Sequence, residues 1–508
     1  MVPAYGPRIE RNKAKMTSKK KTIRRLAAGV GALALGLTGV TAFATAASAA
    51  VDVGPDQPGA PTSGTLTINK YSGGHTANPN PENLLDGVEF TVTQVGRIST
   101  TDPTVCEAID LTDAADWDGL SGLFASAPST PAAPFCLTDV AQDDVTGTNG
   151  QVVFNLDVGI YFVQETDPGE HPIVSPVPDF YVSIPTSVGN DGTGWNYDVV
   201  ADPKNQLQEE PTKTIEEDQE ELVVGSTVEW TLDVPIPTLN NDETFNEAII
   251  TDVLDSRLEY VADSTVMTIG GTDLTQGTHY TVSDNLVWTF TEAGRAILDA
   301  NMGGTLNIVF DTKVLEVGDG TIPNDDYESQ FNGTPTPGTV VPYTYWGELL
   351  INKKDDKGTT LAGAEFQVFE ASAAGTCADD APATGAIATG TSNAAGVVQW
   401  EGATPASPLG LWVANSNGPL SDPFKVYCVY ETVVPAGHTA VDFENAVTIR
   451  PGTSNLVTLN VVNARTDGPE LPLTGAQGTL ALTIVGLLLV SAGTGAILWQ
   501  RHRRNQAA

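Results

Sequence analysis

Hydrophobic and polar residues alternate in short runs along most of the chain. TLTINK (residues 65–70) places Leu66, Ile68 and Lys70 on one face and polar residues on the other, a period of two that is typical of half-buried β-strands. Helical periodicity is limited to the two terminal segments and to EAGRAILDA (residues 292–300), where we expect one short helix. Threonine, valine, glycine and proline are plentiful. The pattern predicts an all-β fold.

Two parts of the chain repeat one order of predicted strands. TLTINK and ELLINK (348–353) open the repeats, YFVQETDPGEH and YCVYETVVPAGH come late in them, and WNYDVVADPKN and LVTLNVVN (456–463) close them. This order resembles two copies of an immunoglobulin-like β-sandwich. Linker-like QLQEEP and TPTPGTVVP bracket a middle module with the strands STVEWTLDV, AIITDVL and TLNIVFDTKV. We therefore expect three tandem β-sandwich domains, at residues 50–205, 206–343 and 344–470.

Charged and amide side chains fall on apolar faces of these strands. In the third domain the alternation turns Lys353, Glu431 and Asn463 inward. A buried unpaired charge costs several kcal/mol, so the three groups must satisfy one another or react. One reading is a buried ion pair with asparagine as a hydrogen-bond partner. The other is attack of a neutral lysine amine on the asparagine carbonyl, assisted by the acid, with loss of ammonia and formation of an isopeptide bond.

The strand WNYDVVADPKN (195–205) divides into two faces. Trp195, Tyr197 and Asn205 fall on one face, and Asp198 and Lys204 on the other. On this phasing Asn205 points into a core and Lys204 points into water. A solvated charge at a strand end is the ordinary role of such a lysine.

Both ends of the chain carry processing signals. KKTIRR, an apolar run and Ala47-Ser48-Ala49 form a secretory signal peptide at residues 1–49. At the other end, residues 471–508 contain LPLTG (Leu471, Pro472, Leu473, Thr474, Gly475), an apolar stretch at 478–499 that is long enough for a transmembrane helix, and the basic tail RHRR. These three parts in this order resemble the cell-wall sorting signal of Gram-positive surface proteins, in which a sortase cuts here between Thr474 and Gly475.

The exported chain between these signals is strongly acidic. Residues 50–474 contain 13 basic and 62 acidic residues, a formal net charge of −49. Such a surface repels nucleic acid and anionic membranes, so we exclude them as partners.

The even number of cysteines in an exported chain favours disulfides. Pairing Cys106 with Cys136, and Cys377 with Cys428, keeps each bridge inside one predicted domain. Loops of that length contribute roughly 4 kcal/mol in the chain-entropy view. Free thiols and other pairings are the alternatives.

No motif indicates an enzyme, a cofactor or a metal. The chain has no P-loop, no GxGxxG and no arguable Ser/His/Asp arrangement, and its five histidines lack metal-ligand spacing. NNDE (240–243) offers oxygen ligands for calcium, but a solvated loop explains it as well.

The complete set of motifs resembles the shaft pilins of sortase-assembled Gram-positive pili, which have Cna-type immunoglobulin-like domains. W-x3-V-x3-PK in WNYDVVADPKN matches the pilin motif, and ET-x2-PxG in YCVYETVVPAGH matches the E-box. The resemblance implies that Lys204 accepts the sortase-bound Thr474 of another subunit, and that Glu431 assists a Lys353–Asn463 isopeptide bond.

The resemblance also implies internal bonds in the other domains. In the middle domain Lys213 would join Asn324 with Asp252 as the assisting acid, and Asn332 is a competing acceptor. In the first domain the trio would be Lys70, Asn205 and Glu165, although YFVQETDPGEH shortens the E-box between threonine and glycine.

These features predict a structural pilus subunit at the cell surface rather than an enzyme. Its expected partners are pilin-specific and housekeeping sortases, other copies of itself, minor pilins, peptidoglycan, and host or bacterial surface receptors. A monomeric wall-anchored adhesin shares LPxTG and the sandwiches but does not need Lys204. A minor pilin at the tip or base of the pilus is another alternative; a tip subunit usually carries a large inserted adhesive domain, and none is evident here.

Overall fold

The computed structural model describes residues 53–466, apart from 75–77, 114, 126–129, 189–193, 241–242 and 284, and also residue 483. The signal peptide and LPLTG lie outside the described residues. No helix in the described part of the chain is long and apolar enough to cross a membrane, and the apolar stretch at 478–499 lies, except for Thr483, outside it. The chain forms two compact units: the first ends at Asn205, and the second comprises 172–174 and everything from Gln206 onward.

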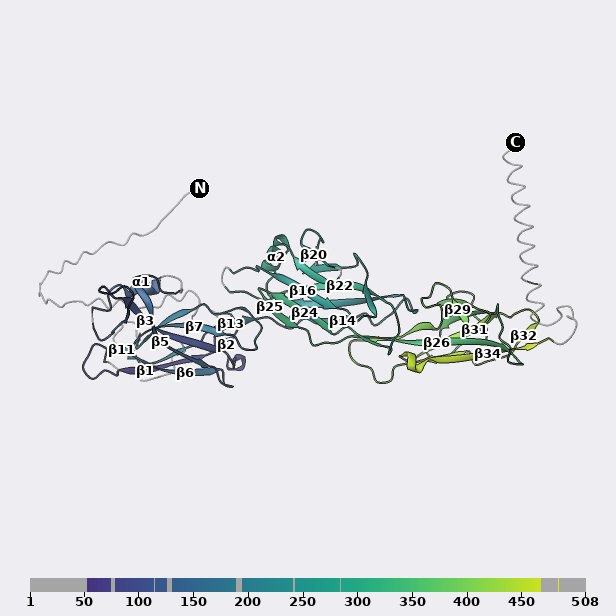
Figure 1. Cartoon of the computed structure of the whole chain (residues 1–508), viewed down its shortest axis with the longest axis horizontal. Helices are drawn as coiled ribbons and strands as arrows, with labels where there is room; N and C mark the ends of the chain where they lie inside the picture. The colour runs from purple at the N-terminus through teal and green to yellow at the C-terminus, as the bar shows by residue number, and fades with distance from the viewer. Residues whose placement is uncertain are drawn as a thin grey trace, which may run out of the picture. The chain divides into compact units, whose positions relative to one another are not determined.

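The first unit is built from antiparallel and parallel strand pairs (Figure 1). One sheet has the order β12–β1–β6 (Asp198–Ala201, Ser63–Asn69, Gln151–Asp157). Another has the order β4–β3–β7–β9 (Cys106–Ala108, Glu89–Ile98, Gly159–Asp167, Phe180–Ile184), and β5 (Phe135–Val145) also pairs with β3. Smaller elements complete it: β10 (Thr186–Val188) with β11 (Gly194–Asn196), η1 (Pro81–Asn83) and α1 (Leu120–Ala125). A further sheet, β2–β13–β8 (Tyr71–Ser72, Lys204–Leu207, Ile173–Ser175), contains the end of the pilin-like motif.

Alternate residues of the first unit's strands are buried, as the period-two pattern predicts. Leu66 and Ile68 on β1, and Phe90 and Val92 on β3, are almost fully buried, while the residues between them are more exposed. A second apolar cluster surrounds α1, where Phe124 packs edge-on against Tyr181.

The second unit contains four large sheets. Two come from the earlier part of the chain: β14–β15–β22–β18–β19 (Thr212–Ile215, Thr227–Pro235, Thr305–Val314, Val266–Ile269, Thr272–Leu274) with β17 (Leu258–Tyr260) on β22, and β20–β21–β16–β24–β25 (Tyr280–Val282, Val287–Phe290, Ala248–Val253, Asp326–Phe331, Thr334–Pro337). The predicted short helix is confirmed as α2 (Glu292–Asp299), which begins after Thr291 because that side chain accepts a hydrogen bond from the Gly294 N–H.

The other two sheets come from the later part of the chain. They are β23–β26–β34–β32 (Thr321–Pro323, Tyr343–Asp355, Val457–Arg465, His438–Ala440) with β30 (Leu409–Ser416) on β26, and β29–β28–β27–β31–β33 (Val398–Trp400, Ala388–Ser392, Glu365–Glu370, Lys425–Val433, Ala446–Ile449), with η2 (Thr453–Asn455) before β34. One apolar core runs through the whole unit and includes Trp230, Trp288 and Trp346. The all-β prediction is confirmed.

Candidate functional site

The predicted trio of the first unit forms a compact buried cluster. Lys70 follows β1, Glu165 lies on β7 and Asn205 lies on β13. The Lys70 Nζ atom is 2.6 Å from Glu165 Oε2 and donates to Asn205 Oδ1 at 2.5 Å, and Asn205 Nδ2 donates to Glu165 Oε1 at 2.6 Å. The Val177 N–H also donates to Asn205 Oδ1. Amine, acid and amide are thus in direct contact.

The third-domain trio is brought together through its acid. Lys353 on β26 and Asn463 on β34 lie on neighbouring parallel strands, and Asn463 is in register with Asp355, two residues beyond Lys353. The Lys353 Nζ atom is 3.2 Å from Glu431 Oε1, and Asn463 Nδ2 donates to Glu431 Oε2 at 3.1 Å. Both Lys353 and Asn463 are fully buried.

The middle-domain trio is also brought together. Lys213 on β14 lies 2.6 Å from Asp252 Oδ2 on β16, and its amine reaches the Asn324 backbone oxygen at 3.4 Å. The Tyr327 ring covers the amine at 4.1 Å, a contact that the sequence analysis missed. Asn332 is used elsewhere: its φ is 51°, and its side-chain oxygen accepts the Asn246 N–H. The structure therefore places Asn324, not Asn332, beside Lys213.

Burial changes the acid–base behaviour of these groups. It lowers the pKa of Lys70 to about 8, against the opposing effect of Glu165. Burial likewise lowers the pKa of Lys213 and of Lys353, although their acid partners oppose it. The pKa of Asp252 is raised, since burial outweighs the attraction of Lys213. Each shift favours a neutral amine, and in the middle cluster a protonated acid.

The polar atoms of these clusters satisfy mainly one another. Buried polar groups in folded proteins are nearly always hydrogen-bonded, and here the lysine amines are the partners of Glu165 Oε2, Asp252 Oδ2 and Glu431 Oε1. In the third cluster, Asn463 Oδ1 is buried with no hydrogen-bond partner among the described residues.

The prediction that Lys204 points into water is wrong. Its side chain is buried, with 2% relative exposure; its amine donates to the Asp202 backbone oxygen at 2.9 Å and lies 5.9 Å from the centre of the Tyr71 ring. The motif is not one strand: it breaks at Tyr197 and again at Asp202–Pro203, between β11, β12 and β13. The second break turns both Lys204 and Asn205 inward, and burial lowers the pKa of Lys204.

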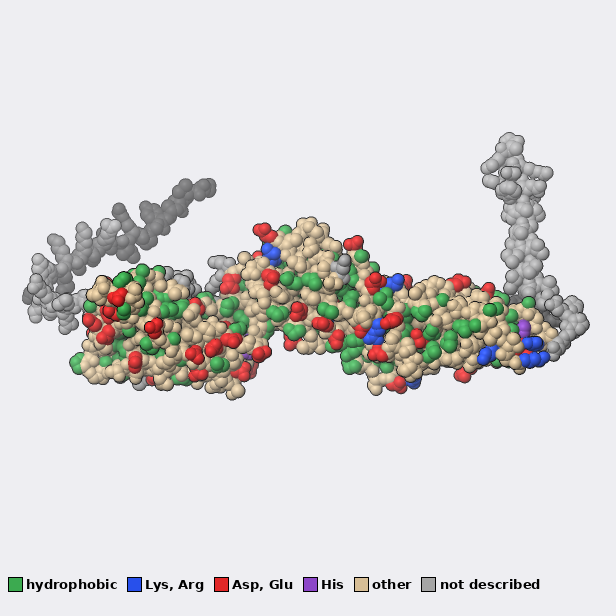
Figure 2. All heavy atoms as spheres, in the orientation of Figure 1, with side chains coloured by type: hydrophobic (Ala, Val, Ile, Leu, Met, Phe, Trp, Pro, Cys, Tyr) green, Lys and Arg blue, Asp and Glu red, His purple; other side chains and the backbone are tan. Residues whose placement is uncertain are grey.

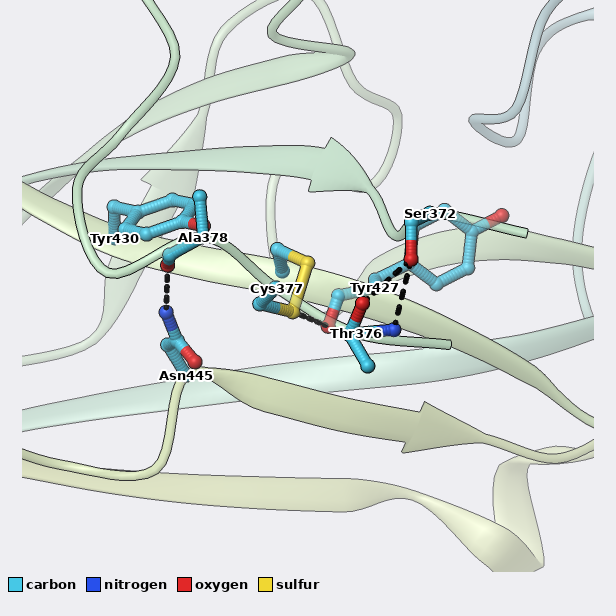
Figure 3. Close-up of a disulfide and its surroundings, with 8 residues drawn as sticks. Ser372, Thr376, Cys377, Ala378, Tyr427, Tyr430 and Asn445 are labelled. Atoms are coloured by element: carbon cyan, nitrogen blue, oxygen red, sulfur yellow. Dashed lines mark hydrogen bonds between the residues drawn. A yellow bond between two sulfur atoms is a disulfide. The ribbon is translucent and has the colours of Figure 1, made fainter. Parts of the chain in front are cut away.

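Both predicted disulfides are present. Cys106 is bonded to Cys136, and Cys377 to Cys428. Figure 3 shows the second bridge between the loop after β27 and strand β31, where the Asn445 side-chain amide also donates to the Ala378 oxygen. The bridge holds the loop against β31, and the hydrogen bond ties the same loop to the residue that precedes β33 (Ala446–Ile449).

The described residues contain no group of three or more histidine, cysteine, aspartate or glutamate side chains arranged to hold a metal ion. The calcium question at NNDE stays untested, because residues 241–242 lie outside the described part.

Known proteins with the same organisation are pilus subunits. Residues 465–506 match the family model of the LPXTG cell wall anchor motif. The chain is 31% identical to the fimbrial subunit type 2 of Actinomyces naeslundii, over 95% of this chain and 97% of that protein. It is 28% identical to the fimbrial subunit type 1 of Actinomyces viscosus, over 85% of this chain and 88% of that protein. The full-length major pilin SpaD of Corynebacterium diphtheriae has a similar fold, with a TM-score of 0.57, 25% identity, and coverage of 80% of this chain and 98% of that one.

The fold and the anchor motif together define a cell-wall-anchored surface protein that is a sortase substrate. The chain belongs to the fimbrial subunit family, and it is a shaft subunit of a Gram-positive surface pilus.

Proposed function

We propose that the shaft grows by joining Thr474 of one subunit to Lys204 of the next, and that isopeptide bonds close each subunit internally. The internal bonds are Lys70–Asn205, Lys213–Asn324 and Lys353–Asn463. The observation that supports them is that each lysine lies against its acid in a buried core and its asparagine belongs to the same cluster, although more than 100 residues separate lysine from asparagine.

The chemistry of each internal bond follows from the contacts. The neutral lysine Nζ attacks the side-chain carbonyl carbon of asparagine, and the acid, which in the first and third clusters already contacts the asparagine Nδ2 atom, takes up the amine's proton. The acid then passes the amine's proton to the departing nitrogen. A C–N bond to lysine forms, the bond to the amide nitrogen breaks, and ammonia leaves.

Polymerisation uses the same nucleophile chemistry between subunits. A pilin-specific sortase cleaves Thr474–Gly475 and holds Thr474 as a thioester; the Lys204 amine attacks it and releases the sortase thiol. The lowered pKa of Lys204 increases its fraction of neutral amine. The Lys204 amine donates a hydrogen bond to the Asp202 backbone oxygen and lies near the Tyr71 ring. The turn at residues 202–204 must therefore open before the amine reaches the thioester. A housekeeping sortase then joins the last Thr474 to peptidoglycan.

We infer that the second unit contains two of the three predicted domains, because it has two pairs of sheets from successive parts of the chain. The division near residue 343 coincides with the start of β26.

Intact-mass measurement of the exported region tests the internal bonds. After allowance for two disulfides, the mass should fall below the sequence mass by one ammonia per bond, three in all. Glu431→Ala should retain one ammonia, because the third cluster loses its proton shuttle. Glu365→Ala, an exposed residue on the adjacent strand β27, is the matched control and should lose all three. A wild-type mass equal to the sequence mass would leave the clusters as buried polar networks.

A further inference from the structure

Among the described residues, most of the exposed basic side chains are concentrated at one end of the second unit. Lys354, Lys357 and Arg465 lie where β26 and β34 end, and Asp355 pairs in register with Asn463 there. Figure 2 shows basic side chains gathered at that end, where Figure 1 labels β32. We call these three residues the basic end.

Two charges of the basic end are unpaired within the described chain. Arg465 is committed to Asp355, its Nε atom donating to Asp355 Oδ2 at 2.6 Å. Lys354 and Lys357 are exposed and form no ion pair with a described residue. They are therefore available to a partner.

The surface next to Lys204 has the opposite charge. In the backbone pairing of strands, Lys204 lies opposite Tyr71, and Tyr71 forms a β-bridge with Leu84. The loop that follows Leu84 contains Asp86. That loop lies against the loop of Gly169, since a Cβ atom added to Gly169 would be 2.6 Å from the Gly87 oxygen.

Four exposed carboxylates belong to these two loops and to η1, and we call them the acidic rim: Glu82, Asp86, Asp167 and Glu170. Figure 2 shows acidic side chains gathered at this end of the first unit, near β2 and β13. None of the four pairs with a described lysine or arginine; Asp86 lies 3.8 Å from His171. Residues 50–205 contain 22 acidic residues and only three basic ones, of which Lys70 and Lys204 are buried.

The covalent link brings these two surfaces together. Arg465 precedes Thr474 by nine residues, and nine extended residues span at most about 30 Å. If Thr474 of one subunit is joined to Lys204 of the next, Arg465 of the first subunit lies within about that distance of Lys204 of the second, and the acidic rim borders Lys204. Most other pairs of surfaces on two chains of charge −49 repel each other.

We propose that the basic end docks on the acidic rim of the next copy of this chain, and that this contact orients Lys204 toward the sortase-bound Thr474. The inference rests on the proposed Lys204–Thr474 link. Exposed ion pairs contribute little to stability, so the contact acts mainly on the rate of productive encounter. The isopeptide bond then holds the joint.

A donor–acceptor assay with purified pilin-specific sortase tests the contact. The donor is the exported region through LPLTG with Lys204→Ala, so it can only donate. The acceptor keeps Lys204 and carries Thr474→Ala. Lys354→Glu/Lys357→Glu in the donor should lower the initial rate of dimer formation roughly five- to tenfold at low salt, and the difference should shrink at about 0.5 M salt. Lys357→Glu alone should also lower the rate, and Lys313→Glu, which reverses one exposed lysine on β22, is its charge-matched control and should change the rate less than twofold.

Charge exchange gives the decisive comparison. Glu82→Lys/Glu170→Lys in the acceptor should restore most of the rate with the reversed donor and slow the reaction with the unaltered donor. Equal rates for the reversed and unaltered donors, or no recovery on exchange, would overturn the docking contact alone. Absence of any dimer from the unaltered pair would overturn the Lys204–Thr474 link itself.

Discussion

Lys70 shows what burial does to a single residue of this fold. Its amine is fully buried, and loss of hydration lowers its pKa to about 8 although Glu165 is only 2.6 Å away. A neutral amine is the nucleophile that the proposed bond requires. The fold therefore activates Lys70 by the same burial that makes the unreacted residue costly.

The unreacted residue should make stability depend on pH. In the Asn205→Ala variant the proposed Lys70–Asn205 bond cannot form, so Lys70 keeps its free amine. Its pKa is then about 8 in the folded state and about 10.4 in the unfolded state. Between these values the unfolded state binds more protons, so the free energy of unfolding should rise as the pH increases from 8 to 10. Urea denaturation at several pH values measures this slope. Adding Lys70→Met to the Asn205→Ala variant removes the titrating group and should flatten the dependence of the unfolding free energy on pH. An equal slope in the single and the double variant would contradict the lowered pKa of Lys70.

The residues of the clusters could be predicted from sequence to different extents. Alternation placed Lys353 and Asn463 inward, because their strands are regular through those positions, and it placed Lys70 inward because that residue directly follows the regular strand β1. It failed for Lys204, since the break at Asp202–Pro203 restarts the alternation. Asn324 precedes β24 and Asn332 follows it. Which of the two lies beside Lys213 depends on a contact between distant parts of the chain, and no local sequence pattern contains that information.

At the scale of elements, β26 connects the two halves of the second unit. Its beginning pairs with β23, its end pairs with β34, and β30 lies beside its first half. The segment before β15 also reaches this sheet: the Val224 N–H donates to the Gly410 oxygen, and the Trp412 N–H donates to the Leu222 oxygen. The sequence predicted the strands themselves, but these pairings between strands far apart in the chain could not be read from it.

Gly410 is the position where this junction tolerates no side chain. A Cβ atom there would lie 2.2 Å from Val224 Cγ2, so Gly410→Ala should force the two segments apart and cost about 1–3 kcal/mol of unfolding free energy. Thermal unfolding, together with protease cleavage near residues 220–226, measures the loss. Gly418→Ala is the control, because a Cβ there has no neighbour within 4 Å. Equal stability of the two variants would show that the junction does not depend on this close approach.

At the scale of the whole molecule, the proposed bonds define where tension runs. A pull on Thr474 reaches the Asn463–Lys353 bond, passes along β26 to the Asn324–Lys213 bond, and leaves through Lys204. Residues 50–203 precede Lys204 in the chain and lie outside this covalent path. Residues 50–203 are thus spared the load that the other domains transmit.

Replacement of Lys204 tests whether the shaft polymerises through this residue. Wall extracts of cells that express the wild-type chain should give a ladder of high-mass species on an immunoblot, and Lys204→Ala should leave only a folded, wall-linked monomer. Lys313→Ala, which removes an exposed lysine from β22, should keep the full ladder. A ladder that persists unchanged in Lys204→Ala would contradict polymerisation through this residue.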